Sequence, residues 1–322
     1  MRLLDTTTLE LMSFQGWNVP GYAILSHVWE TEEATFQDIS NFNNIKDMHG
    51  YAKIVGACDT ARRNGIGYIW IDTCCINKES SAELSEAINS MYKWYSGAQV
   101  CYAYLSDVPS TGDHGDRSLF AMSHWFTRGW TLQELIAPRK VVFYARDWVD
   151  IGTKTTLQDT ISSVTGINPE IIVGRTLLES VPIAVRMSWA AGRNTTREED
   201  IAYSLMGLFD VNMPLLYGEG RKAFIRLQLE IIKKNSDHSI FAWKEDLLSS
   251  MSGGLHGLLA RSPAKFRGLG NVERILDPAS GDEQPGHVSI GETLPYNITN
   301  RGLFIKLPTT EISEARDKGN WL

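Results

Sequence analysis

The strongest constraint on the fold is a series of four short apolar runs that alternate with segments of helical periodicity. Each run is too short for a buried helix and is rich in β-branched or aromatic residues, so we interpret each as a buried strand. The runs are Tyr22–Val28, Tyr68–Asp72, Val100–Leu105 and Val141–Ala145. Strands that alternate with helices predict a parallel sheet with helices on its faces. The predicted fold class is therefore α/β.

Three of the intervening segments read as helices. Apolar residues recur every three or four positions over Tyr51–Asn64, and Asn64 and Gly65 form a typical helix end. A second helix is predicted from about Ser81 to Gly97, and a short third one from Trp130 to Ile136. These helices would supply the layers that cover the sheet.

The second half of the chain is predicted to be mainly helical. We expect helices at 157–165, 201–209 and 223–234, the second opened by a capping box over Thr196–Glu199. In the third, Ile225, Leu229 and Ile232 share one face and predict its buried side. After about residue 245 the composition shifts to Gly, Ser and Pro, with short strand-like pieces at 288–290 and 303–307.

This organisation predicts two units. Residues 1–240 would form one domain, with an α/β core at about 20–150 and a helical part at about 151–240. Residues 241–322 would form a carboxy-terminal extension or linker, partly β in character.

Charge and cysteine usage narrow the class of protein. The 322 residues carry a formal net charge of −7, without a basic block, which argues against nucleic acid as a partner. Three of the four cysteines lie in apolar runs, which suits a reducing compartment. The amino-terminal residues are too polar for a signal peptide, and no run approaches the ~20 apolar residues of a membrane span. We therefore expect a cytoplasmic protein without a membrane span.

Polar residues follow the ends of the predicted strands. In a parallel sheet, ligands bind beyond the carboxyl ends of the strands. This rule places Ser26 and His27, Asp72 to Cys74, and Ser106 with Asp107 on one rim. The segment Arg128–Leu135, which opens the short third helix, is expected near the same rim.

Several enzyme signatures are missing from the sequence. It contains no phosphate-binding Walker loop, no dinucleotide-binding glycine fingerprint, no nucleophile-elbow serine and no zinc-protease motif. The seven histidines are scattered without the spacing of metal ligands. We therefore predict neither a metal site nor a cofactor.

Four longer phrases carry a resemblance to a known family. They are ILSHVWE, YIWIDTCCINK, SHWFTRGWTLQELIAP and GRNTTREEDIAYSLMGLFDVNMPLLYGEG. In this order they resemble the signature blocks of the fungal heterokaryon-incompatibility (HET) domain. The resemblance implies a trigger of programmed cell death in vegetative incompatibility and innate immunity, and assigns residues 1–240 to that domain. Such domains are often joined to a NOD-like receptor module and respond to an incompatibility partner protein.

A more distant resemblance suggests chemistry. The HET blocks are similar in order to the Toll/interleukin-1 receptor (TIR) domain, whose fold is flavodoxin-like. The TIR pattern Trp-Cys-Leu-x-Glu-Leu corresponds to Trp130–Leu135, with Thr131 in place of the cysteine. Glu134 then falls on the catalytic glutamate of NAD-cleaving TIR enzymes, which form homo-oligomers on activation. This implies an NAD+ glycohydrolase in which NAD+ is the substrate and not a cofactor.

The residue types suit that reaction. Nicotinamide leaves NAD+ as a neutral molecule, so a single carboxylate that stabilises the ribosyl cation is sufficient. Glu134 would supply it. Planar tryptophans and Arg128 could hold the rings and the pyrophosphate. The candidate binding residues are Ser26, His27, Trp29, Asp72, Cys74, Arg128 and Trp130.

Each candidate also has a purely structural interpretation. Glu134 could be an exposed helix residue paired with Arg139 or Lys140. His27, Trp29 and Trp130 could have structural roles within the core. Asp72 could cap the loop that follows its strand, and Cys74 could be a thiol packed in the core. Arg128 could pair with Asp72 or Glu134, while Arg193 and Arg197 could reach the pocket. Beside the enzyme, the alternatives are an adaptor that acts by homotypic assembly and a sensor that binds a nucleotide without cleaving it.

Overall fold

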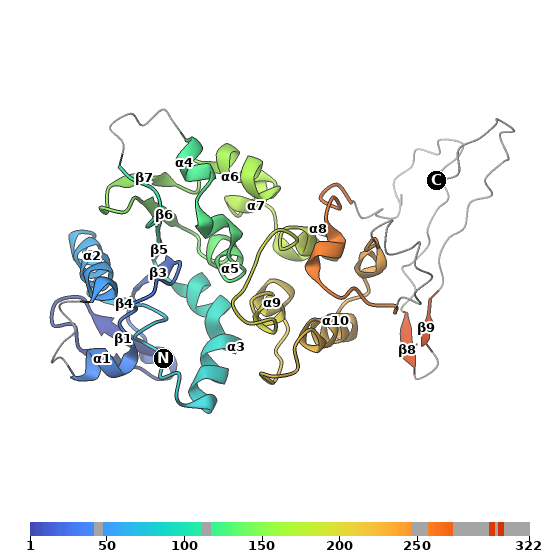
Figure 1. Cartoon of the computed structure of the whole chain (residues 1–322), viewed down its shortest axis with the longest axis horizontal. Coiled ribbons are helices and arrows are strands. Elements are labelled where there is room, and N and C mark those ends of the chain that lie inside the picture. The colour runs from blue at the N-terminus through green and yellow to red at the C-terminus, as the bar shows by residue number, and fades with distance from the viewer. Residues whose placement is uncertain (42–47, 111–116, 246–256, 273–295, 300–301, 306–322) are drawn as a thin grey trace, which may run out of the picture.

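A seven-stranded mixed sheet organises the amino-terminal half of the protein (Figure 1). The computed structural model describes residues 1–41, 48–110, 117–245, 257–272, 296–299 and 302–305. The strand order is β2-β1-β4-β3-β5-β6-β7. The strands are β1 (Arg2–Asp5), β2 (Leu11–Ser13), β3 (Ala23–His27), β4 (Tyr68–Trp70), β5 (Val100–Tyr104), β6 (Val141–Tyr144) and β7 (Asp150–Thr153).

The four predicted strands form the parallel centre of this sheet. β3 pairs in parallel with β4 on one side and with β5 on the other, and β5 pairs in parallel with β6. Residues of β3, β5 and β6 are almost all buried, as expected for strands with helices on both faces. This part of the α/β prediction is confirmed.

Sequence reasoning missed the three outer strands. β1, β2 and β7 pair antiparallel with their neighbours and extend the sheet beyond the predicted core of 20–150. β2 and β7 are short and mostly exposed or half-buried, so they carry no sustained apolar run. Such edge strands form because a neighbour offers free backbone groups, which is a property of the assembled sheet.

Helices cover both faces of the parallel centre. Figure 1 shows α2 (His49–Arg63) on one face and α3 (Ser81–Gly97) and α5 (Thr131–Ile136) on the other. The bounds of α3 agree with the prediction, and Ser80 Oγ accepts the Glu83 N–H at its start. Asn64 ends α2, and the following Gly65 has a φ of 72°, a value that favours glycine. The shorter elements here are η1 (Gly16–Asn18), α1 (Phe36–Asn41), α4 (Ser118–Ala121) and η3 (His124–Thr127).

The helical part is built from short segments. They are α6 (Gln158–Thr165), α7 (Pro169–Ile172), η4 (Leu178–Ser180), α8 (Ile183–Ser188), α9 (Asp200–Tyr203), η5 (Met206–Phe209), α10 (Lys222–Lys234), η6 (His238–Phe241) and η7 (Pro263–Phe266). The predicted helix at 201–209 is therefore two pieces, α9 and η5. The predicted capping box is also wrong, because the Glu199 carboxylate accepts the backbone N–H groups of Gly218 and Gly220 instead.

The long helix near residue 230 was predicted correctly, but its buried face was not. α10 buries Phe224, Leu227 and Ile231, whereas Ile225, Leu229 and Ile232 are only half-buried. The helix carries apolar residues on two adjacent stripes, and the tertiary contacts select one of them. The buried face of α10 also contains Gln228. Its side chain donates a hydrogen bond to the Ala260 carbonyl and accepts one from the Ala260 N–H.

The carboxy-terminal region has one strand pair among its described residues. β8 (Asn297–Thr299) and β9 (Gly302–Phe304) pair antiparallel. β9 overlaps the predicted strand at 303–307, while the predicted strand at 288–290 lies outside the described residues. The boundary at residue 240 stays a prediction.

The packing of the helical part against α3 can be tested at Gly207. A Cβ at this position would lie 2.2 Å from Tyr92 Cβ, a contact that neither residue can relieve by rotating its side chain. We expect Gly207→Ala to reduce the free energy of unfolding by about 1–3 kcal/mol in chemical denaturation. Gly67→Ala is the control, because its added Cβ meets no atom within 4 Å. Equal stability of the two variants would contradict this packing.

Candidate functional site

The candidate site lies at the carboxyl end of β3. The direction in which successive parallel strands are added to the sheet reverses between β3 and β5. The strand β4 lies on one side of β3, and the later strands β5 and β6 lie on the other. Such a switch point is where open parallel sheets bind ligands. Successive strand side chains point to opposite faces. Ser26 accordingly contacts Glu134 of α5, while His27 faces Glu33.

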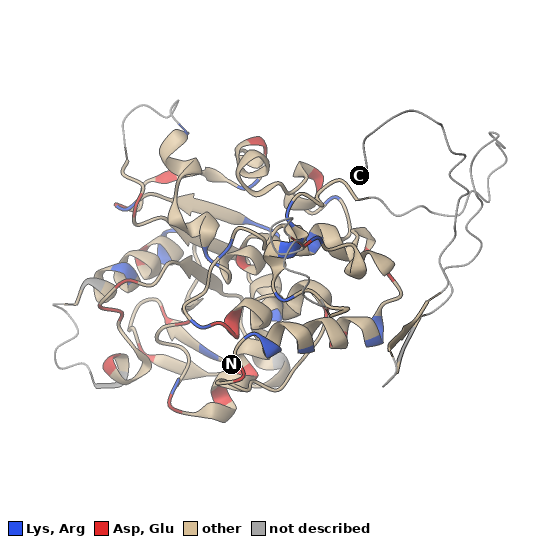
Figure 2. Ribbon diagram, turned by 45° about the vertical axis from the view of Figure 1, so that its right-hand side comes forward, with Lys and Arg blue, Asp and Glu red and all other residues tan. Residues whose placement is uncertain are grey.

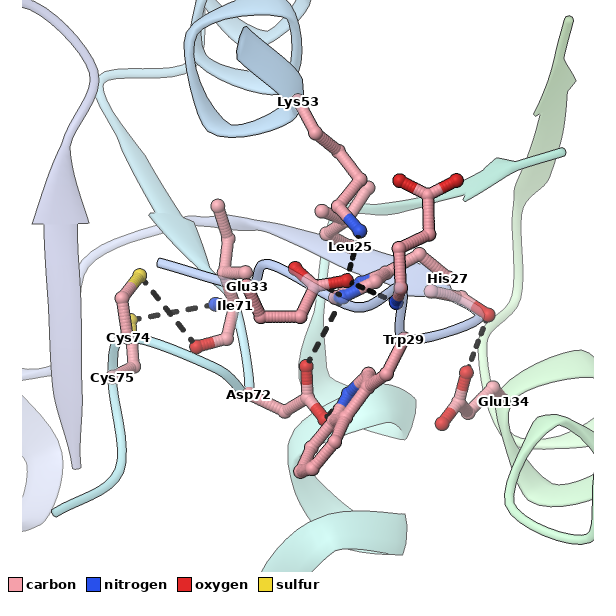
Figure 3. Close-up of polar contacts among 12 residues, drawn as sticks. Leu25, His27, Trp29, Glu33, Lys53, Ile71, Asp72, Cys74, Cys75 and Glu134 are labelled. Carbon is pink, nitrogen blue, oxygen red and sulfur yellow. Dashed lines mark hydrogen bonds and ion pairs between the residues drawn. The ribbon is translucent and has the colours of Figure 1, made fainter. Parts of the chain in front are cut away.

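A buried carboxyl group forms the inner part of the site. Glu134 is only 7% exposed and accepts a hydrogen bond from Ser26 Oγ (Figure 3). Trp125 Nε1 donates to the same Ser26 oxygen at 2.8 Å. The interpretation of Glu134 as an exposed partner of Arg139 or Lys140 is therefore wrong, because its carboxyl group faces the protein interior.

The inner carboxyl group is strongly perturbed. Burial raises the pKa of Glu134 from 4.5 to about 8, and the nearby negative charge of Asp72 acts in the same direction. The hydrogen bond from Ser26 opposes this shift because it stabilises the ionised form. At neutral pH, Glu134 therefore holds a proton in most molecules.

Two buried cations fix both ends of α5, the helix that carries Glu134. Arg193 Nη1 donates to the Arg128 carbonyl at 2.8 Å and to Thr131 Oγ1 at 2.9 Å, at the start of the helix. Lys154, the residue that follows β7, donates to the carbonyl groups of Leu135 and Pro138 at the other end. Lysine near the last carbonyls of a helix is a favourable arrangement. The position of Glu134 thus depends on residues from the later parts of the chain.

The second part of the site, here called the outer cluster, surrounds the His27 imidazole. It consists of His27, Glu33, Lys53, Asp72, Trp29 and Lys78. His27 Nε2 lies 3.8 Å from Glu33 Oε2 and 3.8 Å from Asp72 Oδ1. Trp29 donates its indole N–H to Asp72 Oδ2 at 2.8 Å (Figure 3). The sequence-predicted residues His27, Trp29 and Asp72 therefore do come together.

The outer cluster balances its charges. Lys53 pairs with Glu33, and Lys78 Nζ lies 3.5 Å from the centre of the Trp29 ring, close enough to act on the Asp72 carboxyl group. Burial, with the two lysines, holds the pKa of His27 well below its usual value, so the imidazole is neutral. Burial raises the pKa of Asp72, and Lys78 opposes the shift.

Three predicted binding residues occupy other places. Cys74 is fully buried beside Cys75, on the side of Ile71 away from Glu134 (Figure 3). The hydrogen bond between the two thiols, together with burial, keeps the pKa of Cys74 well above its usual value. Arg128 donates to Thr196 at 3.4 Å rather than to Asp72 or Glu134. Trp130 packs half-buried against the core and hydrogen-bonds with Asp200.

Sequence reasoning missed several residues that build the site. Trp125 lies in the quoted phrase SHWFTRGW, but only the structure shows that it holds Ser26. Glu33, Lys53 and Lys78 carried no motif. Arg193 was named only as a residue able to reach the pocket; it contacts the start of α5, and its charge also interacts with that of Glu134. No sequence spacing signals such contacts, because they join segments far apart in the chain.

The described part of the chain contains no cluster of His, Cys, Asp and Glu suited to holding a metal ion. None of its helices has the length and apolar character needed to cross a membrane. Lys and Arg are dispersed among Asp and Glu over the elements in Figure 2.

The fold and site define an α/β protein with a buried serine–glutamate pair at the switch point of its parallel strands. Residues 22–120 match the family model described as heterokaryon incompatibility protein (HET), and residues 222–256 match a domain of unknown function, DUF8212. The chain is 48% identical over 223 residues to vegetative incompatibility protein HET-E-1 of Podospora anserina. This match covers 67% of the chain and 16% of that relative.

The chain is therefore a heterokaryon-incompatibility (HET) domain protein, as the four sequence phrases predicted. No solved structure matches it. Glu134 and Arg193 lie outside the matched residues 22–120, so the family model does not assign them a role.

The Ser26 hydroxyl offers a direct test of the inner site. Ser26→Ala removes the hydrogen bond that favours the ionised Glu134, so we expect the pKa of Glu134 to rise above about 8 in a carbon-13 NMR titration. It also leaves Trp125 Nε1 without its acceptor, which should cost about 1–3 kcal/mol of stability. Ser188→Ala is the control, since that hydroxyl bonds to a carbonyl of its own helix. An unchanged Glu134 titration would refute the described contact.

Proposed function

We propose that this protein is a cell-death effector of fungal heterokaryon incompatibility that cleaves the nicotinamide–ribose bond of NAD+. The role in incompatibility is supported by the HET family match and by the relative named a vegetative incompatibility protein. The proposal includes assembly into a homo-oligomer on activation and an incompatibility partner, as in the family that the sequence resembles. A cytoplasmic location is part of the proposal.

One observation carries the enzymatic part of this proposal. A glutamate is buried at the switch point of a parallel sheet, where its carboxyl group hydrogen-bonds with a serine and forms no ion pair with an Arg or Lys that the structure describes. A structural carboxyl group in this position would be expected to pair with an arginine or lysine. The cost of burying Glu134 is consistent with a functional role, because perturbed titratable groups cluster at functional sites.

The strand order supports a flavodoxin-like or TIR-like fold. Counted along the chain, the parallel strands lie in the order second, first, third and fourth. This is the order at the start of flavodoxin-like sheets. Glu134 would then act at the position that the distant TIR resemblance implies.

The chemistry assigned to Glu134 requires its ionised form. The oxidised nicotinamide ring of NAD+ is positively charged, and a cation nearby favours a carboxylate over a carboxylic acid. Substrate binding would thus help to ionise Glu134. As nicotinamide leaves, the charge moves to the ribosyl group, and a carboxylate in a site with little water stabilises it strongly. Water then attacks the ribosyl carbon and loses a proton to solvent, which gives ADP-ribose beside the nicotinamide already released.

The first test of this function is Glu134→Gln. We expect the release of nicotinamide from NAD+, followed by chromatography, to fall by about 10²–10³-fold or more. Glu86→Gln, an exposed change on α3, should keep full activity. Cell killing should be lost together with turnover. A variant that keeps its toxicity would instead support a non-enzymatic adaptor.

The same variant should not be less stable than the wild type at alkaline pH. The pKa of Glu134 is about 8 in the folded protein and 4.5 in the unfolded chain. The protonated carboxyl group therefore makes its full contribution to the free energy of unfolding below pH 4.5. That contribution is lost as the pH rises toward 8. Thermal unfolding should therefore show the wild type losing stability relative to Glu134→Gln over this range.

A second test is the pH dependence of NAD+ cleavage. kcat/KM reports the free enzyme, whose Glu134 pKa is raised to about 8. Because the ionised form is active, kcat/KM should rise with pH and level off above about 8. A profile that is flat between pH 6 and 9 would exclude Glu134 as the group that controls the reaction.

A further inference from the structure

The outer cluster contains buried polar atoms that have no hydrogen-bond partner among the described residues. They include both nitrogens of His27, Glu33 Oε2 and Asp72 Oδ1. The His27 side chain is only 1% exposed, yet its Nε2 lies 3.8 Å from each carboxylate oxygen. This distance is too long for a direct hydrogen bond. Orphaned groups of this kind are costly unless something else satisfies them.

The unpartnered atoms come from three separate segments and face one another. His27 ends β3, Asp72 follows β4, and Glu33 comes from the segment between Trp29 and α1. Figure 3 shows both carboxyl groups directed to the imidazole, with Trp29 beside Asp72. Trp29 is 47% exposed, so the cluster meets solvent on this side. The unpartnered atoms themselves are closed off from solvent, so a ligand reaches them when the exposed Trp29 indole moves aside.

The charges indicate what kind of ligand fits. The Glu33 carboxylate is already paired with Lys53, and Lys78 acts on Asp72. Burial keeps the imidazole neutral. With two negative and two positive groups, the cluster gains little from a charged ligand. Its free atoms are mainly hydrogen-bond acceptors, and they require a neutral group with two neighbouring donors.

We propose that Glu33 and Asp72, with His27 between them, bind the vicinal hydroxyls of a sugar, namely the adenosine ribose of the nucleotide. Acidic side chains bind ribose hydroxyls in other nucleotide sites. This inference rests on the proposed function, in which Glu134 takes the nicotinamide ribose. Ser26 and His27 point to opposite faces of β3, so the two carboxylate sites lie on two sides of one strand end. A dinucleotide carries two riboses joined by a pyrophosphate, which matches this arrangement.

The test compares the binding of adenosine and 2′,3′-dideoxyadenosine to the full chain by calorimetry. Adenosine should bind at least about tenfold more tightly, because the dideoxy compound leaves the carboxylates unpaired. In Glu33→Gln this preference should shrink or vanish. Glu32→Gln, an exposed neighbouring change, should keep it.

A second variant separates loss of ligand binding from loss of folding. Glu33→Gln deprives the buried Lys53 of its partner, whereas Asp72→Asn keeps that ion pair. Both should lose the preference while retaining a cooperative thermal transition. Equal binding of the two nucleosides by the wild type, or an unchanged preference in Asp72→Asn, would overturn the proposal and leave a cluster filled by water only.

The outcome is separable from that of the proposed function. If the wild type discriminates between the nucleosides but releases no nicotinamide from NAD+, the sugar site stands and the hydrolase fails. If NAD+ is cleaved and Glu33→Gln leaves both KM and the nucleoside preference unchanged, the sugar site fails and the hydrolase stands.

Discussion

The hydrogen bond between Ser26 and Glu134 is the contact on which the site depends. It joins the central strand of the sheet to α5 and places a carboxyl group where water has little access. Trp125 donates to the same hydroxyl, so the serine orientation is fixed from two directions. Burial without a paired cation raises the pKa of the carboxyl group, and it also makes its charge state responsive to a cationic ligand.

The helical part of the chain is a structural component of the site. Arg193 follows α8, yet it donates to groups at the start of α5, and Lys154, the residue after β7, donates to a carbonyl at its end. Both cations are buried, and Lys154 satisfies backbone carbonyl groups that the end of the short helix leaves free. A fragment limited to residues 22–120 would therefore lack Glu134 and also the groups that hold it in position.

The two polar groups at the end of β3 differ in electrostatic character. Around Glu134 the carboxyl group has hydrogen-bond donors and feels the charges of Arg128 and Arg193, but it forms no ion pair with a described residue. Around His27, carboxylates and lysines alternate and nearly cancel. A single strand separates these surroundings because neighbouring side chains point to opposite faces. One sheet end thus carries two polar groups with different electrostatic surroundings.

The sequence by itself determined the parallel strands, the bounds of α3 and the family, because apolar runs, helix caps and long signature phrases are local patterns. It also brought Ser26, His27, Trp29, Asp72 and Glu134 to one rim, through the rule that parallel strands share their carboxyl ends. Only the tertiary structure decided that Glu134 is buried, that Cys74 and Trp130 turn elsewhere, and that α10 buries Phe224 rather than Ile225. Burial and long-range hydrogen bonds depend on which segments meet in space, and local sequence patterns do not encode that choice.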